Sequence, residues 1–201
     1  MRKLSSTLSN MVLSLTLVAI VAGGVLAGVN EITKSQIERI NDENLAKGIR
    51  SVMGGGNLSV DTPREKDGYV LYDVKDEGGN PVGTAVAVTA QGFGGDMRIL
   101  VGFGTDGRIK GYTVLGNSET PGLGAKVTTW FQKGHEGDII GKNPGTDNLS
   151  VSKDGGEVDA ITASTITSRA FLNAVKEAYG QLSVGKEDED AHTGASPRQA
   201  D

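Results

Sequence analysis

The chain has 201 residues, a net charge of −5 and no cysteine. Without cysteine it cannot form disulfides, ligate an iron–sulfur cluster through thiolates or attach haem through thioethers. Its only histidines are His135 and His192, and no long basic run occurs, so neither a histidine-based metal site nor a nucleic-acid partner is expected. Aromatic residues are few and glycine is abundant, which indicates a modest aliphatic core with many tight turns.

An uncharged apolar segment lies near the amino end. No charged side chain occurs between Lys3 and Glu31, and residues 8–29 are rich in Leu, Val, Ala and Gly. As a helix this segment would be roughly 33 Å long, enough to cross the hydrocarbon core of a membrane. A cleaved signal peptide is the alternative. The apolar stretch is longer than a usual signal core and lacks an A-x-A site, so an uncleaved anchor is favoured.

The flanking charges predict the orientation of this anchor. Arg2 and Lys3 precede it, and the positive-inside rule places them in the cytoplasm. Residues 1–30 are therefore predicted to be a cytoplasmic N-terminus and a single-pass anchor in the inner (cytoplasmic) membrane, with the main domain extracytoplasmic, or periplasmic. Apolar residues at mostly helical spacing next predict a juxtamembrane helix within residues 31–56, which continues to Met53 and is ended by the glycines at 54–56.

Residues 57–185 are expected to form one α+β domain, in which helices pack on an antiparallel sheet. Apolar or alternating runs predict strands at 69–74, 81–90, 96–103 and 109–115. In the third run, alternate residues from Met97 to Phe103 face one side. An Asp-Gly pair within 105–108 predicts a hairpin to the fourth strand.

The second half of this domain is predicted to be mostly irregular before a final helix. A short helix is expected at 127–134, followed by a glycine- and aspartate-rich connection at 134–157. Apolar residues at helical spacing then predict a packed helix from Thr165 to Leu182. Residues 186–201 are acidic and lack apolar anchors, so this tail is predicted to be disordered.

Several enzyme motifs are absent or incomplete. GFGGDM at 92–97 has methionine where a dinucleotide fingerprint needs its third glycine, and GLGAKVTT at 122–129 has alanine where a P-loop needs glycine before the lysine. No nucleophile-elbow motif occurs, and the sequence supplies no partners for His135 as a general base. No catalytic residue and no metal ligand is therefore predicted.

The segment DAITASTITSRAF at 159–171 places three threonines and two serines at the start of the last predicted helix. A helix N-cap needs one hydroxyl, so the others are either solvent-facing or part of a site. A helix start offers free N–H donors and a positive dipole end, which together suit a phosphate. The cluster is therefore interpreted either as a cap or as a phosphate attachment point.

Two motifs resemble a known family. The spacing of Asp159, Thr162 and Thr165 resembles the flavinylation motif D-x-x-[ST]-G-A-T, with Ala163 and Ser164 in place of its glycine and alanine. The segment SETPGLGAK at 118–126 resembles the E-T-P-G-L-G-x-K signature of the G subunit of Rnf electron-transport complexes. The order of anchor, meander, loop and flavinylation motif also agrees with that family.

The resemblance implies a covalent FMN held as a phosphoester on Thr165. Asp159 and Thr162 would be recognised by a flavin transferase of the ApbE family. Further cofactor contacts are expected in the hydroxyl cluster and in the E-T-P-G-L-G loop; the residues are Thr162, Ser164, Thr167, Glu119, Thr120, Gly122, Leu123, Gly124 and Lys126. The chain would be an electron-carrying subunit of a membrane-bound ferredoxin/NAD oxidoreductase ion pump, with other membrane subunits as partners, rather than an enzyme on its own.

Three alternatives stay open on the sequence. The related C subunit of the sodium-pumping NADH:quinone reductase shares the FMN-binding domain. The chain could also be a free-standing anchored flavoprotein reductase, although no donor or acceptor site is visible. An anchored binding domain without flavin would use the hydroxyl cluster only as a cap.

Overall fold

The computed structural model describes residues 8–193, except for the side chains of residues 35–39 and 183–193. The chain divides into two compact units, one ending at Asn44 and the second beginning at Leu45. Helix α1 (Leu8–Val52) contributes to both units, so the predicted anchor and juxtamembrane helix are one continuous helix. Within the described residues, only Leu8–Lys34 is long and apolar enough to cross a membrane. Its large apolar side chains are exposed, as a lipid-facing helix requires.

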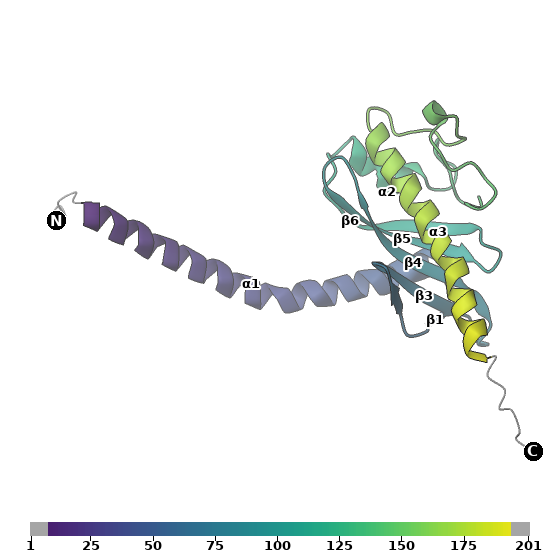
Figure 1. The fold of residues 1–201 in the computed structure, drawn as a ribbon, viewed down its shortest axis with the longest axis horizontal. Helices are drawn as coiled ribbons and strands as arrows, with labels where there is room; N and C mark the ends of the chain where they lie inside the picture. The colour runs from purple at the N-terminus through teal and green to yellow at the C-terminus, as the bar shows by residue number, and fades with distance from the viewer. Residues whose placement is uncertain (1–7, 194–201) are drawn as a thin grey trace, which may run out of the picture. The chain divides into compact units, whose positions relative to one another are not determined.

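The second unit is built on an antiparallel sheet in the order β1-β3-β4-β5-β6, with β2 paired to β3 (Figure 1). The strands are β1 (Ser59–Val60), β2 (Arg64–Lys66), β3 (Tyr69–Lys75), β4 (Pro81–Gln91), β5 (Asp96–Gly104) and β6 (Ile109–Asn117). The four predicted strands are confirmed as β3 to β6, and the Asp-Gly turn joins β5 to β6. Strands β1 and β2 are additions that are too short and too exposed to leave a periodic signal.

One face of the sheet packs against helix α3 (Thr165–Thr193), which crosses it in Figure 1. Met97, Ile99, Val101 and Phe103 are fully buried on this face, as the alternation predicts. The Phe171 ring of α3 stacks on Phe131, with centroids 4.5 Å apart, and meets Tyr112 edge-on at 4.8 Å. These aromatic contacts fix the amino-terminal part of α3 against the sheet.

The segment between β6 and α3 contains little regular secondary structure, as predicted. It contains η1 (Gly124–Lys126), α2 (Val127–Trp130) and η2 (Ser152–Asp154). The buried hydroxyl of Tyr112 donates to the carbonyl of Val127 at 2.7 Å and accepts the N–H of Phe131 at 3.1 Å. Burial raises the pKa of this phenol, so it stays protonated and joins β6 to the segment that follows η1.

The opposite face of the sheet is covered by the end of α1. Ile49, Val52 and Met53 are buried there in a cluster with Leu100 of β5. The backbone of Val52 comes very close to the sheet, because Gly102 of β5 and Gly111 of β6 lie opposite each other beneath it. The globular unit therefore begins at Leu45, earlier than the boundary at residue 57 that the glycine run suggested.

Helix α3 extends further than predicted. It continues to Thr193, so the prediction of disorder is wrong for residues 186–193; residues 194–201 lie outside the described residues. The packed part of α3 supplies the nucleus, from which each further residue adds a helical hydrogen bond at little cost.

A substitution at the glycine pair tests the packing of α1 on the sheet. A Cβ on Gly102 would lie 2.6 Å from the Val52 carbonyl oxygen. We expect Gly102→Ala to destabilise the chain by about 1–3 kcal/mol, because a backbone atom has to move. Gly116→Ala in the neighbouring strand is the matched control, since its Cβ would meet nothing within 4 Å. Urea unfolding of the detergent-solubilised chain, followed by Trp130 fluorescence, measures both; equal midpoints would contradict the close approach.

Candidate functional site

The turn before α3 is held by Ser168. Its hydroxyl accepts the N–H of Ile161 at 2.9 Å and donates to the carbonyl of Ser164 at 3.0 Å. The first helical bond also ends on Ser164, whose carbonyl accepts the Ser168 N–H at 3.0 Å. One hydroxyl of the cluster therefore has the structural role that a capping interpretation requires. The other hydroxyls need a separate explanation.

Ala163 lies in the turn with a φ of 60°. This is the left-handed region, where a side chain with Cβ is strained and glycine is not. The flavinylation motif has glycine at this position, so the backbone shape agrees with the motif even though the residue does not. Ala163 is exposed, and its neighbour Thr162 is exposed as well.

The amino end of α3 leaves backbone donors unused. Because the first helical bond starts at Ser168, the preceding N–H groups of Thr165, Ile166 and Thr167 have no intrahelical acceptor. Thr165 is the first helical residue and is half-buried. A negatively charged group beside Thr165 would meet free N–H donors and the positive end of the helix dipole.

The E-T-P-G-L-G loop is held by the buried side chain of Glu119. Its Oε1 atom accepts the N–H of Phe93 at 2.7 Å and that of Gly94 at 3.3 Å. These bonds join the loop after β6 to the turn between β4 and β5. The loop is closed by bonds to the carbonyl of Thr120 from the N–H groups of Leu123, at 3.1 Å, and Ala125, at 3.2 Å. Gly122 occupies a turn position with a φ of 77°, where glycine is favoured.

The two motifs meet in one cavity of about 340 Å³. It is lined by Phe93, Glu119, Thr120, Leu123, Gly124, Ala163, Ser164, Thr165, Ile166 and Thr167. Of the predicted contact residues, Glu119, Thr120, Leu123, Gly124, Ser164, Thr165 and Thr167 lie in this wall, whereas Gly122, Lys126 and Thr162 do not. Residues about forty positions apart in the sequence thus form a single concave site.

Three lining residues, Phe93, Ala163 and Ile166, are not among the contacts predicted from the sequence. Phe93 and Ile166 are 73% and 54% exposed, and Leu123 of the predicted loop is 42% exposed. These three side chains give the cavity an apolar rim. An aromatic residue between glycines in the GFGG turn was the available signal for Phe93, but the glycine spacing of that turn pointed only to an incomplete nucleotide motif.

The cavity wall contains an unpartnered polar atom. Among the described residues, Thr167 Oγ1 is the one buried side-chain oxygen or nitrogen without a hydrogen-bond partner. A Cβ on Gly124 would lie 2.9 Å from it and closer still to Glu119 Oε2, so only glycine lets these two oxygens pack against this part of the wall. A buried hydroxyl without a partner in the wall of a cavity fits a ligand that brings its own polar groups.

Asp159 lies outside the cavity wall. The Trp130 indole N–H donates to its backbone carbonyl at 2.9 Å, and the hydroxyl of Ser152 bonds its carboxylate at 3.2 Å. The Asp159 side chain is exposed, as is Lys126. Neither residue is thus brought into the cavity, although Asp159 is accessible to another protein.

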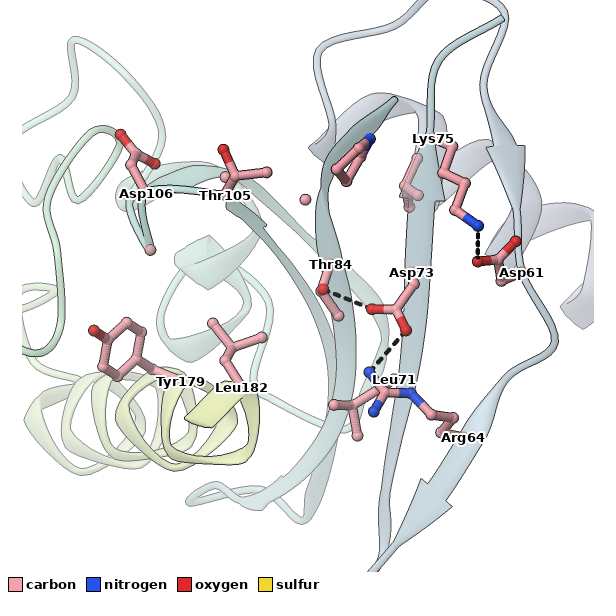
Figure 2. Close-up of a pocket in the computed structure, with 15 residues that line it drawn as sticks. Asp61, Arg64, Leu71, Asp73, Lys75, Thr84, Thr105, Asp106, Tyr179 and Leu182 are labelled. Carbon is pink, nitrogen blue, oxygen red and sulfur yellow. Dashed lines mark hydrogen bonds and ion pairs between the residues drawn. The ribbon is translucent and has the colours of Figure 1, made fainter. Parts of the chain in front are cut away.

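A larger cavity of about 690 Å³ contains none of the predicted residues (Figure 2). Asp73 bonds Arg64 at 2.7 Å and Thr84 at 2.8 Å, and Lys75 pairs with Asp61 at 2.7 Å. Figure 2 shows Tyr179 and Leu182 on the helix across from these pairs. The charged side chains labelled between residues 61 and 75 are thus paired with one another. No group of three or more His, Cys, Asp or Glu side chains among the described residues is placed to hold a metal.

Comparison with known proteins agrees with the site. A family model described as an FMN-binding domain matches residues 92–180, a range that includes every residue lining the smaller cavity. A solved structure, the crystal structure of Shewanella oneidensis NqrC, is 21% identical, covers 63% of this chain and 70% of its own, and has a TM-score of 0.43. That likeness is too low to support a further comparison.

Curated relatives match most of the chain. A protein of Methanosarcina acetivorans is 30% identical over 187 residues, covering 90% of this chain and 97% of its own length. Relatives from Shewanella baltica and Cronobacter sakazakii are 30% and 33% identical, each over 82% of this chain and over 84% and 85% of their own lengths. All three are named as the G subunit of an ion-translocating oxidoreductase complex. These relatives match most of the chain at 30% identity or more, and the FMN-binding family model includes the residues that line the cavity. The chain therefore belongs to the G-subunit family of ion-translocating oxidoreductase complexes.

Proposed function

We propose that this chain carries electrons, through bound FMN, within a membrane-bound ion-translocating oxidoreductase complex of the Rnf type. The observation that carries the proposal is the meeting of the E-T-P-G-L-G loop and the flavinylation motif in one cavity. FMN supplies the redox chemistry. Because the chain has no cysteine, it has no thiolates that could bind a redox-active metal cluster instead. The other subunits of the complex are its partners, and the chain is a redox subunit rather than an enzyme on its own.

The proposed attachment point is Thr165. It lines the cavity at the start of α3, next to the free N–H groups that suit a phosphate. A flavin transferase of the ApbE type would transfer FMN from FAD to Thr165 Oγ1. The new phosphoester bond replaces the pyrophosphate bond of FAD, AMP leaves, and the hydroxyl proton is released. Asp159 and Thr162 are exposed and accessible for recognition by that enzyme.

The residues of the chain would then orient the cofactor. The apolar rim of Phe93, Leu123 and Ile166 offers the kind of surface that a flat aromatic ring needs. Thr167 and Glu119 offer polar contacts deeper in the wall. An anchored binding domain without flavin would not need a buried hydroxyl without a partner in the cavity wall. The names of the curated relatives favour the G subunit over the C subunit of the sodium-pumping reductase.

Mass analysis tests attachment at Thr165. We expect the chain co-expressed with a flavin transferase to gain the mass of one FMN phosphoester, mapped to the peptide that contains Thr165. Thr165→Val should remove the adduct, because no hydroxyl remains to form the ester. Thr128→Val, at an exposed threonine of α2, is the control and should be modified normally. An adduct that persists in Thr165→Val, or that maps to Thr167, would contradict the assignment.

The strained backbone of Ala163 can be tested with two glycine substitutions that should change the stability in opposite directions. We expect Ala163→Gly to stabilise the unmodified chain by about 1 kcal/mol, because glycine tolerates a positive φ. Ala170→Gly, inside α3, should instead destabilise it by about 1 kcal/mol. Ala163→Gly also restores the glycine of the flavinylation motif and should make modification more complete. Thermal unfolding and intact mass measure both effects; destabilisation by Ala163→Gly would show that the turn has another shape.

The orientation of the anchor is a separate proposal. The positive residues before the apolar segment favour a cytoplasmic N-terminus and an extracytoplasmic FMN domain in the inner membrane. We expect a reporter fused after Gly185 to be active only outside the cytoplasm, and the mature chain to retain residues 8–29. A cytoplasmic reporter signal would contradict this orientation. A mature chain that starts near Gly28 would indicate a signal peptide instead.

A further inference from the structure

Two buried oxygen atoms converge on Gly124 in the wall of the smaller cavity. They are Glu119 Oε2 and Thr167 Oγ1, which lie within 3 Å of the position that a Cβ of residue 124 would take. Glu119 is 7% exposed and Thr167 is fully buried. Both residues line the cavity, and they come from different segments, the loop after β6 and the first turn of α3.

The two oxygens differ in what they have already bonded. Thr167 Oγ1 has no hydrogen-bond partner at all, although burial of an unpaired hydroxyl costs free energy. Glu119 uses Oε1 for the N–H groups of Phe93 and Gly94, which leaves Oε2 for the cavity. The pair therefore offers a carboxylate acceptor beside a hydroxyl that can both donate and accept.

This combination selects the chemistry of a ligand. A carboxylate repels a phosphate and needs a donor, whereas the free N–H groups at Thr165 attract a phosphate. Neutral hydroxyl groups satisfy both oxygens of the pair, because each hydroxyl donates one hydrogen bond and accepts others. The wall therefore has two parts close to the first turn of α3. The N–H groups at Thr165 suit a phosphate, and the pair of Glu119 and Thr167 suits hydroxyl groups.

We infer that Glu119 and Thr167 bind the polyol chain of the flavin, the part that joins its phosphate to its ring. The inference rests on the proposed function and adds a position for the hydroxylated part of the cofactor. Glu119 accepts a polyol hydroxyl through Oε2 and keeps the turn of Phe93 in place through Oε1. Binding of a polyol hydroxyl to Glu119 and Thr167 is thereby coupled to the position of the turn that contains Phe93, a residue of the apolar rim.

The test is Thr167→Val, which removes the hydroxyl and keeps the shape of the side chain. We expect this variant to unfold at a higher temperature than the wild type when both are unmodified, because an unpaired buried hydroxyl is lost. We expect flavin attachment at Thr165 to stabilise the variant less than it stabilises the wild type. Thr167→Ser should recover the wild-type gain, and Thr89→Val, at an exposed strand position, should change neither form.

An equal gain in melting temperature for the wild type and Thr167→Val would overturn the inference while leaving the proposed function intact. A wild-type chain that takes no flavin would instead overturn the proposed function. If Thr167→Val escapes modification, riboflavin and lumiflavin titrated into Thr165→Val and Thr165→Val/Thr167→Val decide the question, because only riboflavin has the polyol. Loss of riboflavin affinity alone, several-fold in the double variant, supports the pair. No difference between the two flavins, including no binding of either, overturns it.

Discussion

The carboxylate of Glu119 joins the parts of the molecule on which the candidate site depends. Through Oε1 it holds the turn between β4 and β5, and its own backbone belongs to the loop that follows β6. Its second oxygen faces Gly124 and the first turn of α3. Three segments that are far apart in the sequence thus meet at one buried side chain. Loss of that side chain would leave backbone donors of the turn without their acceptor.

The rest of the domain supports this junction from below. Phe171 of α3 stacks on Phe131, and the Tyr112 hydroxyl bonds the backbone of Val127, which begins α2, and of Phe131, which follows it. The start of α3 and the segment after the loop thus pack on the same aromatic cluster. Arg169 forms a bidentate pair with Asp154, both bonds being 2.7 Å, which ties α3 to the turn ahead of Asp159. Residues 159–165 are therefore held by packed neighbouring elements, while the Thr162 side chain is exposed and Ser164 and Thr165 line the cavity.

The sequence predicts local features of this structure better than long-range ones. Alternation identified the buried face of β5, and apolar residues at helical spacing identified the start of α3 at Thr165, because both signals depend on neighbouring residues. The rim residues Phe93 and Ile166 could not be assigned, because nothing in their spacing shows that the β4–β5 turn meets the first turn of α3. The start of the domain was also misplaced. The glycines at 54–56 were predicted to end a juxtamembrane helix outside the domain, but Ile49, Val52 and Met53 before them are already core residues.

Val52 packs closely over Gly102 and Gly111, and this contact decides where the chain can be cut to separate the domain from its anchor. A cut at the triple glycine would look natural, yet it would remove Ile49, Val52 and Met53 from the sheet. Val74, Ala85 and Leu100 would then form an uncovered apolar face, of the kind that promotes self-association. A membrane-free form of the protein needs to begin no later than Leu45, where the compact unit begins. The last turns of the long helix thus belong to the electron-carrying domain, because they cover the face of the sheet that α3 leaves open.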